Sequence, residues 1–259
     1  MTSLPFFQVD AFADRPLAGN PAAVMPLERW LDDRLMQAIA AENNLAETAF
    51  TVPSESDAVD FELRWFTPTL EVNLCGHATL AAAHILIHSE PVRFSTRSGT
   101  LTVSRRGSLL ELDMPAAPPE PAELPELLRA VGVLGETFLS RDGNGNALVL
   151  VDNEDAVRAV QPDFSALAKL PYLVSVTAPG DEHDIVSRVF AAFHGVPEDP
   201  VTGSAHTCLV PFWATRLGRN EFIALQASER TGVLHCRLEG DRVLLGGHCH
   251  TVIVGQFQL

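Results

Sequence analysis

Basic residues are scarce in this sequence, and their scarcity limits the possible partners. The 259 residues include 18 Lys and Arg against 33 Asp and Glu, which gives a formal net charge of -15 and a pI near 4.9. A protein that binds nucleic acid needs a stripe of Lys and Arg to neutralise phosphates. The composition therefore argues against nucleic acid as a partner.

Closely spaced cysteines and long apolar runs are also lacking. The four cysteines (Cys75, Cys208, Cys236 and Cys249) are far apart and form no C-x-x-C pair, so neither a disulfide framework nor a zinc knuckle is indicated. No apolar run approaches the ~20 residues of a membrane helix, and residues 1–10 lack the basic region of a targeting signal. We expect a cytoplasmic protein that does not contact a membrane.

The composition and one proline-rich segment indicate a globular protein in two parts. Hydrophobic residues make up 46% of the chain and charged residues 20%, and the length allows one large or two small domains. Residues 114–125 carry five prolines and mark the clearest boundary. We predict an N-terminal half over 1–115 and a C-terminal half over 116–247. A closing strand near 248–259 can return to the N-terminal half.

The strongest local signal is a polar turn at residues 198–206 that leads into a helix. Pro200 fixes its own φ and favours an extended Asp199, Gly203 permits a close backbone approach, and residues 205–216 are largely apolar. Free backbone N–H groups at such a helix start, with the positive end of the helix dipole behind them, suit a carboxylate or a developing oxyanion.

The same construction occurs earlier in the chain, where residues 74–79 precede the alanine-rich run 80–87. The elements before and after each turn also match: 33–43, 48–52, 61–65, 92–96 and 101–103 correspond to 164–170, 172–177, 185–190, 222–225 and 233–236. Two similar halves, each with one anion-receptive helix start, predict a cleft between them where both starts meet.

Glu47 is a candidate general acid/base. It stands directly before residues 48–52, which have the pattern of a buried strand. Burial raises the pKa of a carboxyl group and allows it to exchange protons near neutral pH. The alternative is an acidic residue at a strand end that reaches solvent or pairs with an Arg.

His77 and Cys75 lie at the start of the first of these helices. The dipole pushes a histidine in the first turn towards its neutral form, which can hydrogen-bond a substrate; the alternative is a capping or packed residue. The pKa of a thiol at such a start falls. A racemase with two thiols would need a second cysteine at the matching place, which is Thr202, so we interpret Cys75 as a packed residue.

Other polar residues have both a functional and a structural interpretation. Asn20 could donate its amide to a ligand or serve a turn, and Asp199 and Ser204 could contact a ligand or cap a helix. His248 and His250 would share one face of a terminal strand over 243–254, but no third ligand lies nearby in sequence, so we predict no metal site. The sequence also predicts a hairpin turn at 142–146 and a helix over 155–170 that restarts at Pro162.

Three runs carry a resemblance to a known family: NLAETAF from Asn44, FTP from Phe66 with LCGHAT from Leu74, and EDPVTGSAH from Glu198. They resemble the signatures of the PhzF-like isomerases of phenazine biosynthesis, and the match extends from residues 7–10 to the closing strand. That family is similar in fold to diaminopimelate epimerase. The resemblance therefore implies an α+β fold with two pseudo-equivalent halves, each a curved, mostly antiparallel, barrel-like sheet around a central helix, with the active site between them.

The resemblance also implies roles for individual residues. Glu47 matches the catalytic acid/base, while His77 and Asp199 match residues that hold the substrate and assist proton transfer. Gly76, Gly203 and Ser204 match positions that bind a substrate carboxylate, and Asn20 resembles an asparagine near the substrate of the epimerases. The sequence departs from the family at Asn73 and at 191–193, where a proline is usual; neither departure touches a proposed catalytic group.

The function implied is that of a cofactor-independent isomerase which moves a proton within a small carboxylate-bearing substrate, in a protein that is commonly a homodimer. Two alternatives stay open. One is a racemase or dehydratase of small amino or hydroxy acids that uses Cys75 with Asp199 or Thr202. The other is a non-catalytic binding protein that keeps the fold, since fold does not guarantee activity. The sequence does not identify the substrate.

Overall fold

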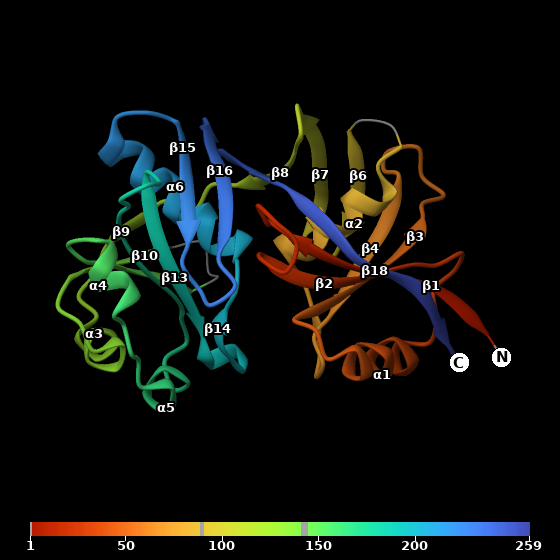
Figure 1. The fold of residues 1–259 in the computed structure, drawn as a ribbon, viewed down its shortest axis with the longest axis horizontal. Coiled ribbons are helices and arrows are strands. Elements are labelled where there is room, and N and C mark those ends of the chain that lie inside the picture. Colours follow the sequence, from red (N-terminus) through yellow and green to blue (C-terminus); the bar gives the residue numbers. More distant parts are fainter. Residues whose placement is uncertain (1, 89–90, 141–144) are drawn as a thin grey trace. The chain divides into compact units, whose positions relative to one another are not determined.

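The computed structural model describes residues 2–88, 91–140 and 145–259, and the chain divides into two compact units (Figure 1). Unit 1 consists of Met1–Asp113 together with Gly246–Leu259, and unit 2 is Met114–Leu245. Both ends of the chain therefore belong to unit 1. No helix within the described residues is long and apolar enough to cross a membrane.

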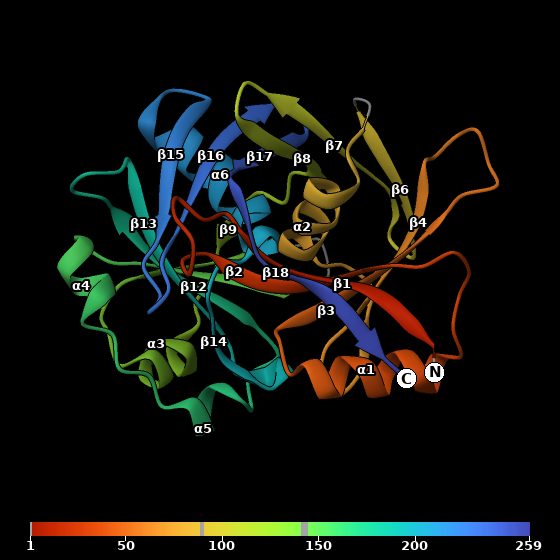
Figure 2. The same cartoon turned by 45° about the vertical axis from the view of Figure 1, so that its right-hand side comes forward.

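Unit 1 is built on a curved mixed sheet around one central helix (Figure 2). Strand β1 (Ser3–Ala11) pairs antiparallel with both β18 (Cys249–Gln258) and β2 (Asn20–Pro26), and β2 runs parallel to β3 (Glu47–Pro53). The ladder continues through further strands, which are β4 (Phe61–Phe66) with the short β5 (Glu71–Val72), then β6 (Val92–Thr96), β7 (Gly99–Arg106) and β8 (Leu109–Pro115).

The two helices of unit 1 differ in how much of their surface is buried. Helix α1 (Asp33–Asn43) buries only the stripe of Met36, Ile39 and Ala40, which packs in a core cluster with Phe50 and Phe66 of the sheet. In contrast, every residue of α2 (Gly76–Leu86) from Gly76 to Ala83 is buried. Its small alanines let the surrounding strands approach on all sides, so α2 is the core of the unit.

Unit 2 repeats this plan. Its strands pair in the order β9 (Pro119–Pro121), β10 (Glu136–Ser140), β11 (Asn146–Leu150), β12 (Leu173–Pro179), β13 (Ile185–Ala191), β15 (Glu221–Gln226) and β16 (Gly232–Glu239), with β14 (Val196–Asp199) also on β13. The parallel pairs β11–β12 and β13–β15 correspond to β2–β3 and β4–β6 of unit 1. Strand β17 (Arg242–Gly247) leads the chain back to unit 1.

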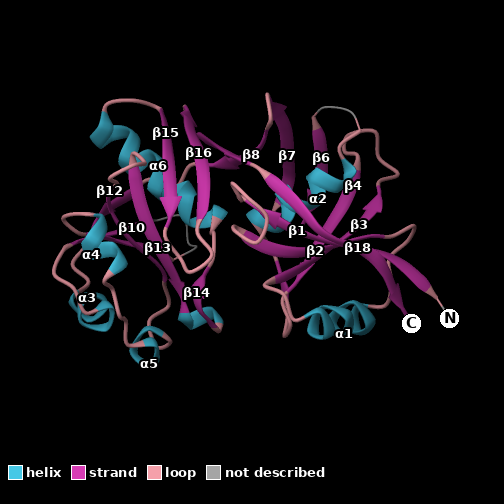
Figure 3. Ribbon diagram, in the orientation of Figure 1, coloured by secondary structure: helices cyan, strands magenta, loops and turns pink. Residues whose placement is uncertain are grey.

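Short helices and one long helix complete unit 2 (Figure 3). The short ones are α3 (Pro125–Val131), α4 (Glu154–Arg158), α5 (Phe164–Leu167) and the 3-10 turn η1 (Ala192–His194). The long helix α6 (Gly203–Leu217) is buried along most of its length. Pro211 inside it has no N–H for the carbonyl of Thr207, and that carbonyl instead accepts from the backbone N–H of Ala117 at 2.9 Å.

An ion pair occurs at the same place in both units and demonstrates their equivalence. Arg64 on β4 binds both carboxylate oxygens of Glu71 on β5 at 2.7 and 2.8 Å. Arg188 on β13 binds Glu198 on β14 in the same two-point manner, at 2.8 Å for each bond. Each guanidinium also stacks over the phenylalanine two residues further on, with its Cζ atom 5.2 and 5.1 Å from the ring centroid.

The structure differs from the sequence predictions in three segments. The helix expected over 155–170, with a second part from Pro162, is two separate short helices, and the second begins where Asp163 accepts from the N–H of Ala166. The terminal strand expected over 243–254 is divided into β17 and β18 after Gly247, and β2 from Asn20 to Pro26 is a strand that was not predicted. The hairpin turn predicted at 142–146 lies largely outside the described residues.

Candidate active site

Glu47 is the first residue of β3, beside Ala22 of the parallel strand β2. Its side chain is 18% exposed, and among the described residues the carboxylate has no arginine partner of the kind that one interpretation of the sequence suggested. Oxygen Oε2 lies 3.1 Å from Nε2 of His77 instead. The start of the strand therefore aims Glu47 at the start of helix α2.

His77 is the second residue of α2 and is 4% exposed. Its other ring nitrogen, Nδ1, lies 3.2 Å from the side-chain nitrogen of Asn20 and 3.6 Å from the sulfur of Cys75. Asn20 is fully buried as the first residue of β2. Four of the residues singled out in the sequence thus meet in unit 1.

The contact between Glu47 and His77 is close but lacks the alignment of a hydrogen bond. Within the described part of the chain, neither Oε2 of Glu47 nor Nε2 of His77 has a hydrogen-bond partner, although both atoms are buried. Buried polar atoms are ordinarily paired, because an unmet donor or acceptor costs on the order of 1–3 kcal/mol. The two atoms are therefore available to a molecule that enters the site.

The electrostatics of His77 correct the expectation of a neutral ring. Burial opposes a charged imidazole, but the neighbouring Cys75 and Glu47 favour it, and the balance raises the pKa of His77 well above its ordinary value. Since burial, assisted by Glu47, raises the pKa of the Cys75 thiol to about 11, that thiol is neutral at pH 7. The Glu47 carboxylate is then the charge beside a protonated His77, and the shift is opposite to the one expected from the helix dipole alone.

The raised pKa also separates Cys75 from the usual cysteine at a helix start. Cys75 is the N-cap of α2 and is 7% exposed. The sequence suggested that the helix start would lower the pKa of the thiol, whereas desolvation is the larger effect here. Cys75 is thus a thiol in contact with His77 and not a ready thiolate base.

The starts of α2 and α6 are unlike those of the other capped helices. Asp32, Asn153 and Asp163 cap α1, α4 and α5 through side-chain oxygens, while Cys75 and Thr202 make no such bond. The first N–H groups of α2 and α6, which begin at Gly76 and Gly203, are therefore not occupied by a capping side chain.

The two helix starts share one further arrangement. In α2 the hydroxyl of Thr79 donates to the Cys75 carbonyl at 2.6 Å, and in α6 Nδ1 of His206 donates to the Thr202 carbonyl at 2.8 Å. In each helix a side chain four residues on thereby binds the carbonyl of the N-cap residue. This contact holds the turn in the same form in both units.

Asp199, Gly203 and Ser204 lie together in unit 2. Asp199 ends β14, and its Oδ2 accepts from the hydroxyl of Thr202 at 2.5 Å. Gly203 and Ser204 are the first two residues of α6, as Gly76 and His77 are of α2. The turn thus has the form predicted from its sequence, and the roles assigned to these three residues stay predictions.

Gln226 is a residue of this turn that the sequence analysis missed. It is fully buried at the end of β15, where its Oε1 accepts from the N–H of Thr202 at 2.9 Å and its Nε2 donates to the carbonyl of Asp199 at 2.8 Å. Its one sequence signal is an amide side chain directly after the apolar run 222–225. Gln226 holds the backbone of the turn on both sides of Pro200.

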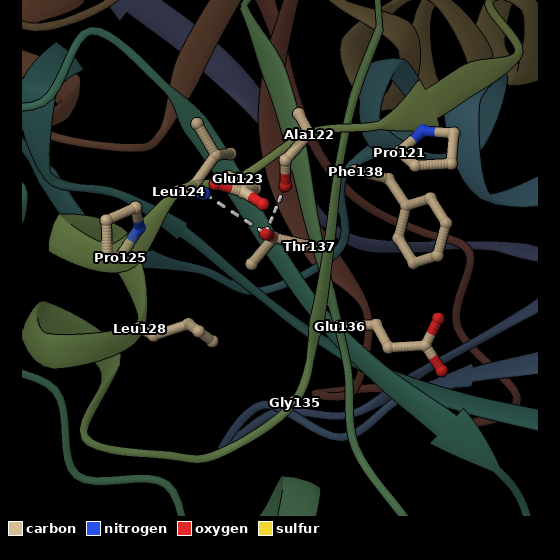
Figure 4. A pocket seen from close by; sticks show the side chains of 10 residues that line it. All are labelled: Pro121, Ala122, Glu123, Leu124, Pro125, Leu128, Gly135, Glu136, Thr137 and Phe138. Carbon is tan, nitrogen blue, oxygen red and sulfur yellow. Dashed lines mark hydrogen bonds between the residues drawn. The ribbon is translucent and has the colours of Figure 1, made fainter.

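The surface hollow shown in Figure 4 does not contain any of the predicted site residues. It has a volume of about 510 Å³ and lies in unit 2, between the start of α3 and β10. Thr137 forms part of its wall, donating to the carbonyl of Ala122 and accepting from the N–H of Leu124. No histidine or cysteine lines it, and its carboxylates are those of Glu123 and Glu136.

A profile of the family described as phenazine biosynthesis-like protein matches residues 9–255. A Pseudomonas aeruginosa protein named uncharacterized isomerase PA2770 is 51% identical over 263 residues, with 99% of each chain covered. The crystal structure of a PhzF-family phenazine biosynthesis protein from Enterococcus faecalis is 42% identical, covers 100% of both chains and superimposes with a TM-score of 0.93. A hydroxyproline epimerase from Agrobacterium vitis shares the fold alone, with 10% identity over 98% of this chain and 92% of that one and a TM-score of 0.62.

Proposed function

The chain belongs to the phenazine biosynthesis-like protein family, and we propose that it is an isomerase that moves a proton within a small carboxylate-bearing substrate without a bound cofactor. One observation carries the proposal. A carboxylate and an imidazole, Glu47 and His77, lie 3.1 Å apart at a helix start, and their facing atoms are buried and make no hydrogen bond with a described residue. Such a pair can hold and release a proton where water is largely excluded.

Glu47 is the proposed acid/base. In the first step the substrate C–H bond breaks, an O–H bond forms on Glu47, and the electron pair stays on the substrate, spread towards its unsaturated or carboxylated neighbour. In the second step Glu47 returns the proton to another carbon of the same molecule. A positioned base contributes about 10²–10⁴-fold to such a step.

His77 and the helix starts are proposed to stabilise the negative charge of the substrate. A protonated His77 faces the substrate through Nε2, and the uncapped N–H groups at Gly76 donate hydrogen bonds to the oxyanion of the reacting group. Asp199, Gly203 and Ser204 are proposed to serve the same substrate, the last two by binding its carboxylate. Asn20, which contacts Nδ1 of His77, is proposed to orient the ring.

A thiol-based racemase is the less favoured candidate. It would need Cys75 as a thiolate near neutral pH, and the pKa of that thiol is raised to about 11. Its partner in the other unit would be Thr202 or Asp199, neither of which is a thiol. A protein that only binds its ligand remains the second rival, and it would leave the hydrogen atoms of the ligand unexchanged.

We also propose a cellular compartment and an oligomeric state for the protein. We place the protein in the cytoplasm, since all four cysteines are free thiols, and we propose that it assembles as a homodimer, as the family resemblance implies.

The test is a screen in deuterium oxide. The protein is incubated with carboxylated cyclic compounds and with small amino and hydroxy acids, and each compound is analysed by mass spectrometry. The proposal predicts one or more compounds that gain solvent deuterium and appear as a second isomer. A ligand that binds, as shown by a thermal shift, yet never gains label would contradict the isomerase and support the binding protein.

A further inference from the structure

The side chains proposed to move the proton also form a set of metal-ligand atoms. Glu47, Cys75 and His77 each offer one such atom, and these atoms all lie within 4.8 Å of one another. No other group of three potential ligands of this kind occurs among the residues that the structure describes, and neither His248 nor His250 is part of it. We propose that Glu47, Cys75 and His77 bind a thiophilic divalent cation such as Zn²⁺ and that the bound ion inhibits the enzyme.

The spacing of the donor atoms suits a tetrahedral ion. Zn²⁺ binds thiolate sulfur at about 2.3 Å and imidazole or carboxylate atoms at about 2.0–2.2 Å, so its ligand atoms stand roughly 3.3–3.6 Å apart. The sulfur of Cys75 is 3.6 Å from Nδ1 of His77, and Oε2 of Glu47 is 3.1 Å from Nε2. These two distances involve different ring nitrogens, so binding needs a shift of roughly 1 Å in one side chain.

Burial and unmet bonding capacity provide a second, independent argument. The His77 side chain is 5% exposed, and its Nε2 and the facing Oε2 of Glu47 lack hydrogen-bond partners. An ion between them would satisfy both atoms. The donor set of sulfur, nitrogen and oxygen selects Zn²⁺ and its softer neighbours over Mg²⁺ and Ca²⁺, which require oxygen ligands.

The binding step is balanced as a ligand exchange. Hydrated Zn²⁺ loses three water molecules, the thiol proton of Cys75 and one imidazolium proton of His77 leave to solvent, and bonds form from the ion to sulfur, to the freed imidazole nitrogen and to a carboxylate oxygen. A fourth position stays open to water. No oxidant or reductant takes part.

The inhibition rests on the proposed function, while the binding does not. With its carboxylate bound to Zn²⁺, Glu47 cannot accept a substrate proton, and the ion also occupies the place of the reacting carbon. The sequence predicted no metal site, because the cysteines form no C-x-x-C pair and no third ligand lies near His248 and His250 in the chain. The cluster joins a strand start and a helix start, which are distant in sequence.

The test uses the full chain, freed of metal with a chelator. Co²⁺ is titrated while the sulfur-to-cobalt charge-transfer absorption is recorded, and Zn²⁺ is then titrated by calorimetry. We expect one ion per chain and a charge-transfer band. In Cys75→Ser the band disappears and Zn²⁺ binds more than about 100-fold more weakly, a larger loss than that of a supporting residue. Cys249→Ser, which removes another thiol of unit 1, keeps both signals.

Glu47→Gln provides a second variant should Cys75→Ser not fold, and it is expected to weaken Zn²⁺ binding at least about tenfold. Absence of the band in the unsubstituted protein, or a band that survives Cys75→Ser, would overturn the metal site. Because these readouts need no substrate, they separate the two proposals. If Glu47→Gln were fully active and the unsubstituted protein still showed the cobalt band, the proposed isomerase mechanism would be wrong and the metal site would stand.

Discussion

His206 gives the protein a specific sensitivity to acid that can be measured as stability. The ring is fully buried in the first turns of α6, and burial lowers its pKa to about 4, although the bond from Nδ1 to the Thr202 carbonyl partly offsets this shift. In the unfolded chain the same group titrates near 6.5. Between about pH 6.5 and pH 4, the unfolded state therefore binds a proton at His206 and the folded state does not.

The size of this effect follows from the two pKa values. Stability from this group is complete above pH 6.5, declines as the pH falls, and reaches a total loss of about 3 kcal/mol below pH 4, at about 1.4 kcal/mol for each pKa unit. Between pH 8 and pH 5 the loss is about 2 kcal/mol. A loss of this size is a large fraction of the 5–15 kcal/mol that stabilises a typical domain.

The assay is urea unfolding followed by circular dichroism at pH 8 and pH 5. His206→Asn keeps a nitrogen able to donate to the Thr202 carbonyl but does not titrate. We expect it to be the less stable protein at pH 8 because it leaves a small cavity, and the gap to the parent protein should shrink by about 2 kcal/mol at pH 5. The exposed His194→Asn should keep the parental pH dependence. A gap that is the same at both pH values would refute the reasoning.

Three further substitutions test other parts of the structure by the same unfolding assay. Arg64→Met removes the two-point bond to Glu71 and should lower the free energy of unfolding by about 2 kcal/mol. The control Arg34→Met, at an exposed position, should lower it by less than about 0.5 kcal/mol. Equal effects would show that the pair does not stabilise the fold. Gly19 has a φ of +67°, and Gly19→Ala would place a methyl group against the backbone oxygen of Ala11 in β1. The free energy of unfolding should fall by more than about 2 kcal/mol. An unchanged value would contradict this close approach. Trp213→Phe loses the 3.0 Å bond from its indole N–H to the Thr177 hydroxyl and should cost about 1–2 kcal/mol, which an unchanged midpoint would disprove.

Much of the fold could be predicted because its local signals agree with its tertiary structure. The apolar stripe of α1 and the turns before Gly76 and Gly203 identified three helices, and the resemblance to PhzF-like isomerases and the α+β class are confirmed. Strand β2 was not predicted, because Asn20 and the proline after it favour turns, while pairing with β1 decides their conformation.

The sequence indicated which residues to consider for the candidate site, but not their electrostatic interactions. The sequence placed Glu47 at a strand start and His77 at a helix start, and could not show that 3.1 Å separates them. The neighbouring Cys75 and Glu47 together raise the pKa of His77, which is the opposite of the neutral ring expected from the sequence. Gln226 was missed for a similar reason, since its two bonds to the turn join residues that are far apart in the chain.

The most direct test of the central claim is the rate of deuterium incorporation by Glu47→Gln into a substrate found in the screen. Glutamine keeps the shape of the side chain but cannot accept a proton, so the rate should fall about 10²–10⁴-fold. The matched control Glu42→Gln, an exposed residue of the same unit, should retain the parental rate. An unaltered rate in a folded Glu47→Gln protein would show that the proton moves by another group.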